Sequence, residues 1–167
     1  LAALVSLASV AVPALKYDAP KEWTSKTPSS SMRVAEFTLP KAAGDAEDAT
    51  LTIYFFGAGQ GGNVQANIDR WISQMAQPDG KDSATVAKTT KLTANGLNIT
   101  LVDVSGTYIA EVSPGSAERV NKPGFRQRAT VIETAEGPYF VKLVGPAKTV
   151  ARWDESFMTF LKSVKVG

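Results

Sequence analysis

The sequence contains no cysteine and no histidine among its 167 residues. Without cysteine these residues form no disulfide, no thiolate nucleophile, no cysteine-ligated zinc or iron–sulfur cluster, and no lipid-modified cysteine. Without histidine they provide no serine–histidine or cysteine–histidine catalytic pair, and no side chain that titrates near neutral pH when unperturbed. An enzyme would need paired carboxylates, an activated lysine or a carboxylate-bound metal. We therefore expect no cofactor and no metal site, and a binding role in preference to catalysis.

The charge balance is also weak. Eighteen lysines and arginines face 16 acidic residues, which gives a net charge of +2, and the basic residues form no run or stripe. Proteins that bind polyanions usually concentrate basic residues on one face. We therefore expect no nucleic-acid partner. The content of 44% apolar and 20% charged residues is that of an ordinary globular domain with a real core.

The first 15 residues, LAALVSLASVAVPAL, carry no charge. This stretch is too short for a membrane span of about 20 residues but fits the apolar region of a secretory signal, about 7–15 residues. Val12-Pro13-Ala14 offers small residues for cleavage after Ala14. We expect residues 1–14 to be the remnant of a signal peptide, truncated at its start, and the protein to be periplasmic or extracellular. A retained anchor, which would be the one membrane contact, and a buried N-terminal helix are the alternatives.

The rest of the chain divides into a leader and one domain. Residues 15–31 are rich in Pro, Ser, Thr and Lys and predict an extended leader, with Trp23 folding back as an apolar anchor. Residues 32–167 predict a single α+β domain. Its fold class is a mainly antiparallel sheet of about six strands covered by two principal amphipathic helices.

The expected elements follow from hydrophobic periodicity and turn signals. Apolar residues recur at helical spacing from Val64 to Met75, with Asn63 as the N-cap, and again from Val150 to Val164 after Pro146. Ala94-Asn95-Gly96 predicts a tight hairpin turn, and Ser113–Phe125, with two Pro-Gly steps, predicts an exposed loop. The expected strands are 32–39, 51–56, 85–92, 97–104 (with a possible continuation after a kink at Gly106), 126–134 and 139–144.

Gly57, Gly59 and Gly62 lie between a strand and a helix with the spacing G-x-G-x-x-G. This spacing occurs in dinucleotide-binding turns, where a strand and helix alternation follows and an acidic residue ends the next strand. Here two strands precede the turn, consecutive hairpins follow it, and no Lys-Ser/Thr pair follows the glycines as in a P-loop. We interpret the turn as a sharp connection that needs positive φ angles. Nucleotide or anion binding at the turn, by a binding protein or an enzyme, remains the alternative.

Several short segments of the sequence occur in an order that resembles known groups of proteins. A Trp, MRVAEFTLP, LTIYFFG, the glycine turn, NIDRWISQM, GPYFVKLVGP and a final FLKSV resemble a group of uncharacterised exported bacterial proteins. The element order is also similar to the PsbP-like fold, shared with Mog-type Ran-binding proteins and small exported lipoproteins. The resemblance spans Trp23 to Val164 and implies an antiparallel sheet between helices, with a binding or accessory role. It brings no catalytic residues, because fold does not fix function.

Two surfaces are candidates for a ligand. The glycine turn exposes backbone amides near Arg70, although a solvated arginine beside a core tryptophan is the plainer interpretation. The second surface is an aromatic and basic patch near the long loop, formed by Phe125 and Arg126 with Tyr108, Arg128 and Tyr139. The candidate ligand-binding residues are Gly59, Gln60, Gly61, Gly62, Asn63, Arg70, Phe125 and Arg126. The expected partner is an unidentified protein or small molecule of the cell envelope.

Overall fold

The computed structural model describes residues 14–167. The expected signal segment therefore lies outside the described residues, apart from Ala14. Among the described residues, no helix has the length and apolar character to cross a membrane.

An eight-stranded sheet forms the centre of the described chain, and its strands follow the order β2-β3-β4-β9-β8-β7-β5, with β6 also paired to β7. Every pairing in this sheet is antiparallel. A second, two-stranded sheet joins β1 to β10 near the two ends of the described chain. The strands are β1 Leu15–Lys16, β2 Thr24–Lys26, β3 Arg33–Leu39, β4 Ala49–Phe55, β5 Met75–Ala76, β6 Lys88–Ala94, β7 Leu97–Tyr108, β8 Lys122–Glu133, β9 Tyr139–Pro146 and β10 Lys165–Val166.

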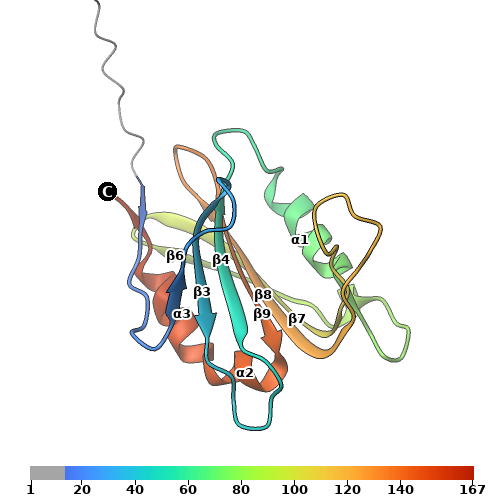
Figure 1. Cartoon of the computed structure of the whole chain (residues 1–167). Coiled ribbons are helices and arrows are strands. Elements are labelled where there is room, and N and C mark those ends of the chain that lie inside the picture. The colour runs from blue at the N-terminus through green and yellow to red at the C-terminus, as the bar shows by residue number, and fades with distance from the viewer. Residues whose placement is uncertain (1–13) are drawn as a thin grey trace, which may run out of the picture.

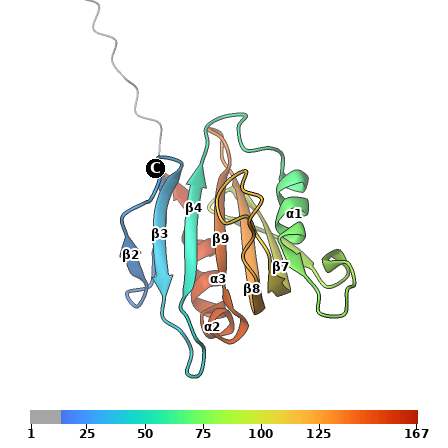
Figure 2. The same cartoon turned by 45° about the vertical axis from the view of Figure 1, so that its right-hand side comes forward.

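Helices cover both faces of the sheet (Figure 1). On one face, α1 (Val64–Ser73) buries Ile68 and Trp71 against Val102, Val131 and Phe140. On the other, α2 (Ala147–Arg152) and α3 (Asp154–Ser163) enclose the larger core, which includes Trp23, Phe157 and Phe160. Figure 2 shows α1 beside β7 and β8, with α2 and α3 behind the strands. We call the side that carries α1 the α1 face.

The first helix begins at the expected cap. The Asn63 side chain accepts a hydrogen bond from the Ala66 amide at 2.8 Å, which satisfies one of the free amides of the first turn. The helix ends two residues earlier than its apolar pattern suggested. Met75, expected as the last helical residue, instead lies in β5 and pairs with Tyr108. A short strand of two residues has no periodicity of its own, so the helical pattern of the preceding residues masked it.

The closing helix, expected as one element, is divided at Trp153. The Trp153 backbone leaves helical geometry with φ −103° and ψ 10°, and its indole donates to the carbonyl of Pro40 at 2.9 Å. Asp154 and Glu155 then occupy the first turn of α3, where acidic residues favour the positive end of a helix. The apolar stripe is unaffected by the division, because Val150, Phe157 and Leu161 are fully buried.

All three expected hairpins are confirmed: β3 with β4, β6 with β7, and β8 with β9. At the turn between β6 and β7, Asn95 and Gly96 both have positive φ, 50° and 79°, as this tight turn requires. The expected kink at Gly106 is a register shift between Gly106 and Tyr108. The count of about six strands was too low, because the sheet also contains β2 and β5.

The expected loop Ser113–Phe125 is shorter than the sequence suggested. Strand β8 begins at Lys122 and continues through Pro123 and Gly124, so the second Pro-Gly step lies within a strand. Phe125 pairs with both Gly106 and Pro146 in neighbouring strands, and this tertiary pairing overrides the turn preference of the dipeptide. In Figure 2 the remaining loop between β7 and β8 crosses in front of β8 and β9.

The glycine turn does connect a strand to a helix, and Gly57, Gly59, Gly61 and Gly62 all have positive φ, between 68° and 103°. A dinucleotide-binding fold needs parallel strands joined by crossover helices. The antiparallel pairing of the eight-stranded sheet excludes that fold for the described residues. The turn geometry therefore supports the interpretation as a sharp connection.

Candidate functional site

Strand β9 is buried on both faces except at Lys142 and Val144, which are partly exposed. Lys142 is the one charged residue in YFVKLVGP, and its cross-strand partners are the uncharged Thr52 and Ala129. Side chains alternate along a strand, so Lys142 shares the α1 face with Phe140, which packs beneath Trp71. A lysine in this position is unusual, because buried charges in proteins are normally paired.

The Lys142 ammonium is held by two neutral oxygens. It donates to the Gln74 side-chain oxygen at the end of α1 and to the Tyr108 hydroxyl at the end of β7, both at 2.7 Å. Its nitrogen also lies 5.0 Å from the centre of the Tyr108 ring. No carboxylate among residues 14–167 forms an ion pair with Lys142. Lys142 is therefore a hydrogen-bonded cation without a counterion in the described chain.

Two arginines add positive charge near Lys142. Arg33, from β3, pairs with Glu36 and lies over the ring of Tyr54 at 5.6 Å. Arg70, from α1, is exposed and donates to the side-chain oxygen of Asn67 at 2.7 Å. One carboxylate thus accompanies three cations on this part of the α1 face. We call this group the Lys142 cluster; its members are Arg33, Tyr54, Arg70, Gln74, Tyr108 and Lys142.

The electrostatics of the cluster shift two pKa values. Burial of the amine, together with the positive charges of Arg70 and Arg33, lowers the pKa of Lys142 to about 7. Burial, together with the neighbouring Tyr54, raises the pKa of Tyr108 to about 12, and Arg33 partly opposes this shift. Near neutral pH the lysine therefore exists both as ammonium and as free amine, whereas Tyr108 keeps its proton.

The glycine turn is linked to Arg70 through one buried side chain. The Asn67 amide nitrogen donates to the carbonyls of Gly61 and Asn63, and its oxygen accepts from Arg70. Gly59 and Gln60 are exposed in the turn, and so is Gly62. The structure therefore links Gly61 and Asn63 to Arg70 through Asn67, and Arg70 is itself a member of the Lys142 cluster.

The second candidate surface is divided by the sheet. Phe125 and Arg126 are consecutive residues of β8, so their side chains point to opposite faces. Phe125 is buried and stacks on Tyr108, with ring centres 6.3 Å apart. Tyr139 belongs to the core on the opposite face. Phe125 therefore supports the Lys142 cluster from below, whereas Arg126 lies on the other side of the sheet.

Arg126 is occupied by carboxylates of the protein itself. Its guanidinium donates twice to Asp103, at 2.8 and 2.6 Å, and also to Asp154 at 3.0 Å. Arg128 pairs with the same two carboxylates. This network ties the start of α3 to β7 and β8 and gives Arg126 a structural role in the described chain.

Sequence reasoning did not include Lys142, Arg33 or Gln74 among the candidate residues. A signal for Lys142 was present, because one lysine interrupts the apolar run Tyr139–Val144 of a strand that is otherwise buried on both faces. Arg33 and Gln74 carried no such signal. Gln74 contacts Lys142 only because α1 ends above β9, and Arg33 acts on its pKa only because the strand order separates β3 from β9 by a single strand.

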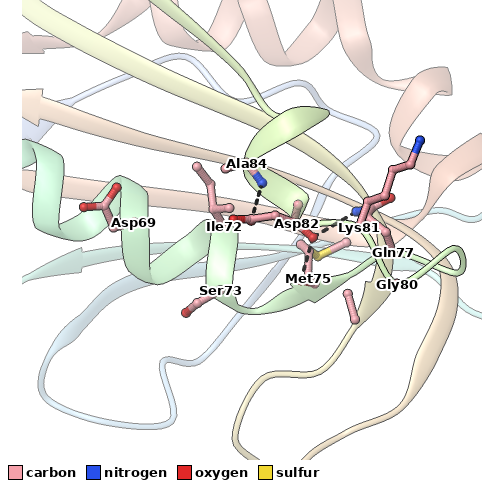
Figure 3. A pocket seen from close by; sticks show the side chains of 11 residues that line it. Asp69, Ile72, Ser73, Met75, Gln77, Gly80, Lys81, Asp82 and Ala84 are labelled. Carbon is pink, nitrogen blue, oxygen red and sulfur yellow. Dashed lines mark hydrogen bonds between the residues drawn. The ribbon is translucent and has the colours of Figure 1, made fainter.

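Two hollows lie elsewhere on the described surface. The first, about 460 Å³, lies between the end of α1 and the segment around the 3₁₀-helix Ser83–Thr85. Figure 3 shows Asp69 and Lys81 at opposite ends of this hollow, with Asp82 hydrogen-bonded to Ala84. The second, about 580 Å³, includes Asp103 and Arg126, which are already paired. The polar groups of both hollows are thus largely engaged within the protein.

The part of the chain that the structure describes contains no group of three or more acidic residues placed to hold a metal ion. Asp45, one of the acidic residues of the loop before β4, instead accepts hydrogen bonds from the amide and hydroxyl of Thr149, in the first helical turn of α2.

Comparisons with known proteins give fold similarity alone. No family model and no curated protein sequence matches the chain. The chain is similar to the crystal structure of LpqN, a protein involved in cell envelope biogenesis of Mycobacterium tuberculosis, with a TM-score of 0.51 and 11% identity. That match covers 92% of this chain and 83% of LpqN. A structure of PA94, a protein of unknown function from Pseudomonas aeruginosa, matches with a TM-score of 0.47, 12% identity and coverage of 84% and 94%.

Proposed function

We propose that this protein is an exported binding or accessory protein of the cell envelope, and that it binds a small anionic ligand at the Lys142 cluster. The observation that carries the proposal is the Lys142 amine, which is partly buried, has no carboxylate partner among the described residues and lies near two arginines. A charged group that burial disfavours is often a functional one. An anionic ligand would supply the missing negative charge.

The geometry around the cluster fits this role. Arg33 and Arg70 lie over the rings of Tyr54 and Trp71, so both guanidinium groups are oriented by aromatic contacts. Arginine forks match carboxylates and phosphates in two-point contacts. Gly59, Gln60 and Gly62 are exposed in the glycine turn, which Asn67 links to Arg70. The proposed site contains Gly61, Asn63 and Arg70, which were candidates from the sequence, and has Lys142 as its central residue.

The location in the envelope rests on two further arguments. The apolar segment before Lys16 has the composition of a secretory signal. LpqN, which is similar in fold, is described as involved in cell envelope biogenesis. We also propose the PsbP-like fold, which the order of the sequence pieces suggested, as the wider fold family. The mass of the protein recovered from the envelope fraction tests export, since cleavage after Ala14 gives a chain that begins at Leu15.

Ligand binding is tested by thermal unfolding with inorganic phosphate, acetate and citrate at pH 6.5. A ligand at 100 times its Kd stabilises the folded state by about 2.7 kcal/mol. We expect stabilisation of the wild type, a much smaller effect on Arg70→Gln, and an unchanged effect on Lys148→Met, which removes an exposed lysine of α2. Equal stabilisation of all three proteins would indicate binding elsewhere.

A protein partner held at a sheet edge is the second candidate. Six of the seven residues of β6 are exposed or partly exposed, and β6 pairs with β7 alone among the described strands. Open edges can accept an additional strand. Lys88 and Lys91 on this strand, however, resemble the charged residues that protect edges from pairing. A pull-down from the native envelope, with no effect of small anions on stability, would favour this candidate.

A further inference from the structure

The contacts of Lys142 suit both protonation states of its amine. As an ammonium it donates to Gln74 and Tyr108. As a free amine it keeps the donation to Gln74 and accepts a hydrogen bond from Tyr108, because a phenol hydroxyl both donates and accepts. In either state the Lys142 nitrogen keeps its hydrogen bonds to both Gln74 and Tyr108. A free amine held in this way is a nucleophile.

We propose that Lys142 forms a reversible imine with an aldehyde or ketone that also carries an anionic group. The anionic half of this ligand rests on the proposed function, with Arg70, which forms no ion pair in the described chain, binding the negative charge; Arg33 is nearby but already pairs with Glu36. The carbonyl half rests on the arrangement of Lys142 and Tyr108. The class of ligand is therefore an oxo acid or a phosphorylated carbonyl compound.

The reaction needs no oxidant or reductant. The Tyr108 hydroxyl first turns from the Lys142 nitrogen to the carbonyl oxygen, which frees the nitrogen lone pair. The lone pair then forms a bond to the carbonyl carbon as the C=O π bond breaks, and the oxygen takes a proton from the Tyr108 hydroxyl while the nitrogen returns a proton to Tyr108. In the second step the nitrogen lone pair forms the C=N bond, and the hydroxyl leaves as water with a proton from Tyr108. The remaining N–H proton restores Tyr108. The sum is amine plus carbonyl giving imine plus water.

Tyr108 is well placed for this proton transfer. Its hydroxyl lies 2.7 Å from the Lys142 nitrogen, and its ring is fixed by stacking on the buried Phe125. Gln74, at the end of α1, holds the other side of the amine. Each of the three groups comes from a different element, so the folded chain orients the amine before any ligand arrives.

Borohydride trapping tests the proposal on the full chain. The protein is incubated at pH 7.5 with glyoxylate, which has an aldehyde and a carboxylate, and reduced lysines are mapped by peptide mass spectrometry. We expect Lys142 to be labelled at least about tenfold faster than Lys148, a factor that corresponds to about 1.4 kcal/mol. With acetaldehyde, which lacks the carboxylate, the ratio of the labelling rates of Lys142 and Lys148 should be much smaller. Labelling of Lys142 no faster than Lys148 would overturn the proposal.

Three variants separate the roles. Lys142→Met should remove the fast label, and Lys148→Met should leave it intact. Arg70→Gln should slow both aldehydes, because it removes a charge that lowers the pKa of Lys142, and it should slow glyoxylate clearly more than acetaldehyde. Tyr108→Phe, which keeps the stacked ring, should slow both aldehydes about equally, and an unchanged rate would contradict the proton transfer. Stabilisation by phosphate without fast labelling would refute the imine alone, whereas fast labelling by both aldehydes without any stabilisation by phosphate would refute the anion site.

Discussion

Lys142 has a lower pKa in the folded protein, about 7, than its ordinary value of 10.5. Between these values the unfolded chain holds a proton that the folded protein has released, so stability should rise as the pH increases. The slope is at most about 1.4 kcal/mol per pH unit. We expect the free energy of unfolding in urea to increase from pH 7 to pH 9.5 in the wild type, and to vary much less in Lys142→Met.

The charged groups next to Lys142 should not add a pH dependence of their own between pH 7 and pH 9.5. The hydrogen bond between Arg33 and Glu36 raises the pKa of the arginine and lowers that of the carboxyl, so both keep their charges across this range, and Tyr108 keeps its proton because its pKa is about 12. Lys148→Met, which changes an exposed lysine, is the matched control and should follow the wild type. Parallel pH curves for the wild type and Lys142→Met would show that Lys142 has an ordinary pKa in the folded protein.

Gly61 differs from the other glycines of the turn in its surroundings. A Cβ at Gly61 would lie 2.7 Å from the ring of Phe140, whereas one at Gly59 would meet nothing within 4 Å. Both residues have positive φ, so alanine is strained at either position by about 1–2 kcal/mol. We expect Gly61→Ala to lower the free energy of unfolding by about 1–3 kcal/mol more than Gly59→Ala, as overpacking does. Equal losses in urea unfolding would contradict the close contact.

At the scale of elements, the ion network fixes α3 against the sheet. Six contacts of 2.6–3.3 Å between oppositely charged atoms join Asp103 from β7 and Asp154 from α3 to Arg126 and Arg128 from β8. Arg126→Met leaves carboxylate oxygens of Asp103 and Asp154 without their donor, which costs about 1–3 kcal/mol. The exposed pair of Arg119 and Glu111, at 4.0 Å, provides the control.

Arg119→Met should change the free energy of unfolding by no more than about 0.5 kcal/mol, because exposed ion pairs contribute little. Chemical denaturation of both variants at low and high salt gives the comparison. A loss for Arg126→Met no larger than that for Arg119→Met would show that the network does not hold α3 in place.

The sequence allowed the longer elements to be predicted because each has its own period or turn signal. The α1 stripe, the Asn63 cap, the Asn95-Gly96 turn and the closing apolar stripe are local features, and they lie where expected. The short strands β1, β2, β5 and β10 have two or three residues each, too few for a period. Pro123 and Gly124 looked like a turn, and only the neighbouring strands show that they belong to β8.

At the scale of the whole molecule, the site depends on contacts that no local pattern contains. The pairing of β4 with β9 joins residues such as Thr52 and Lys142, which are far apart in the sequence. That pairing brings Lys142 beneath the end of α1 and near Arg33. The glycine turn and Arg70 could be identified as candidates from the sequence, but the cluster to which Arg70 belongs could not.

The leader is part of the same folded unit in the described chain. Leu15 and Trp23 are buried in the core on the α2 and α3 side, and the Trp23 ring lies 5.4 Å from that of Phe160. Strand β2 extends the sheet beside β3. A chain that begins at Leu15 keeps all of these contacts. One that begins at Ser31 should be less stable than it by at least about 3–5 kcal/mol, the cost of removing a buried tryptophan.

Urea unfolding of the three chains, followed by tryptophan fluorescence and circular dichroism, measures this difference. Trp23→Ala in the chain that begins at Leu15 separates the tryptophan from the rest of the leader. If its loss equals that of the chain that begins at Ser31, the leader acts mainly as the carrier of one anchor. If the shorter chain loses clearly more, β2 and Leu15 stabilise the sheet as well, and residues 15–31 then belong to the domain. If the chain that begins at Ser31 is as stable as the longer chains, neither Trp23 nor the rest of the leader stabilises the domain, and the prediction is wrong.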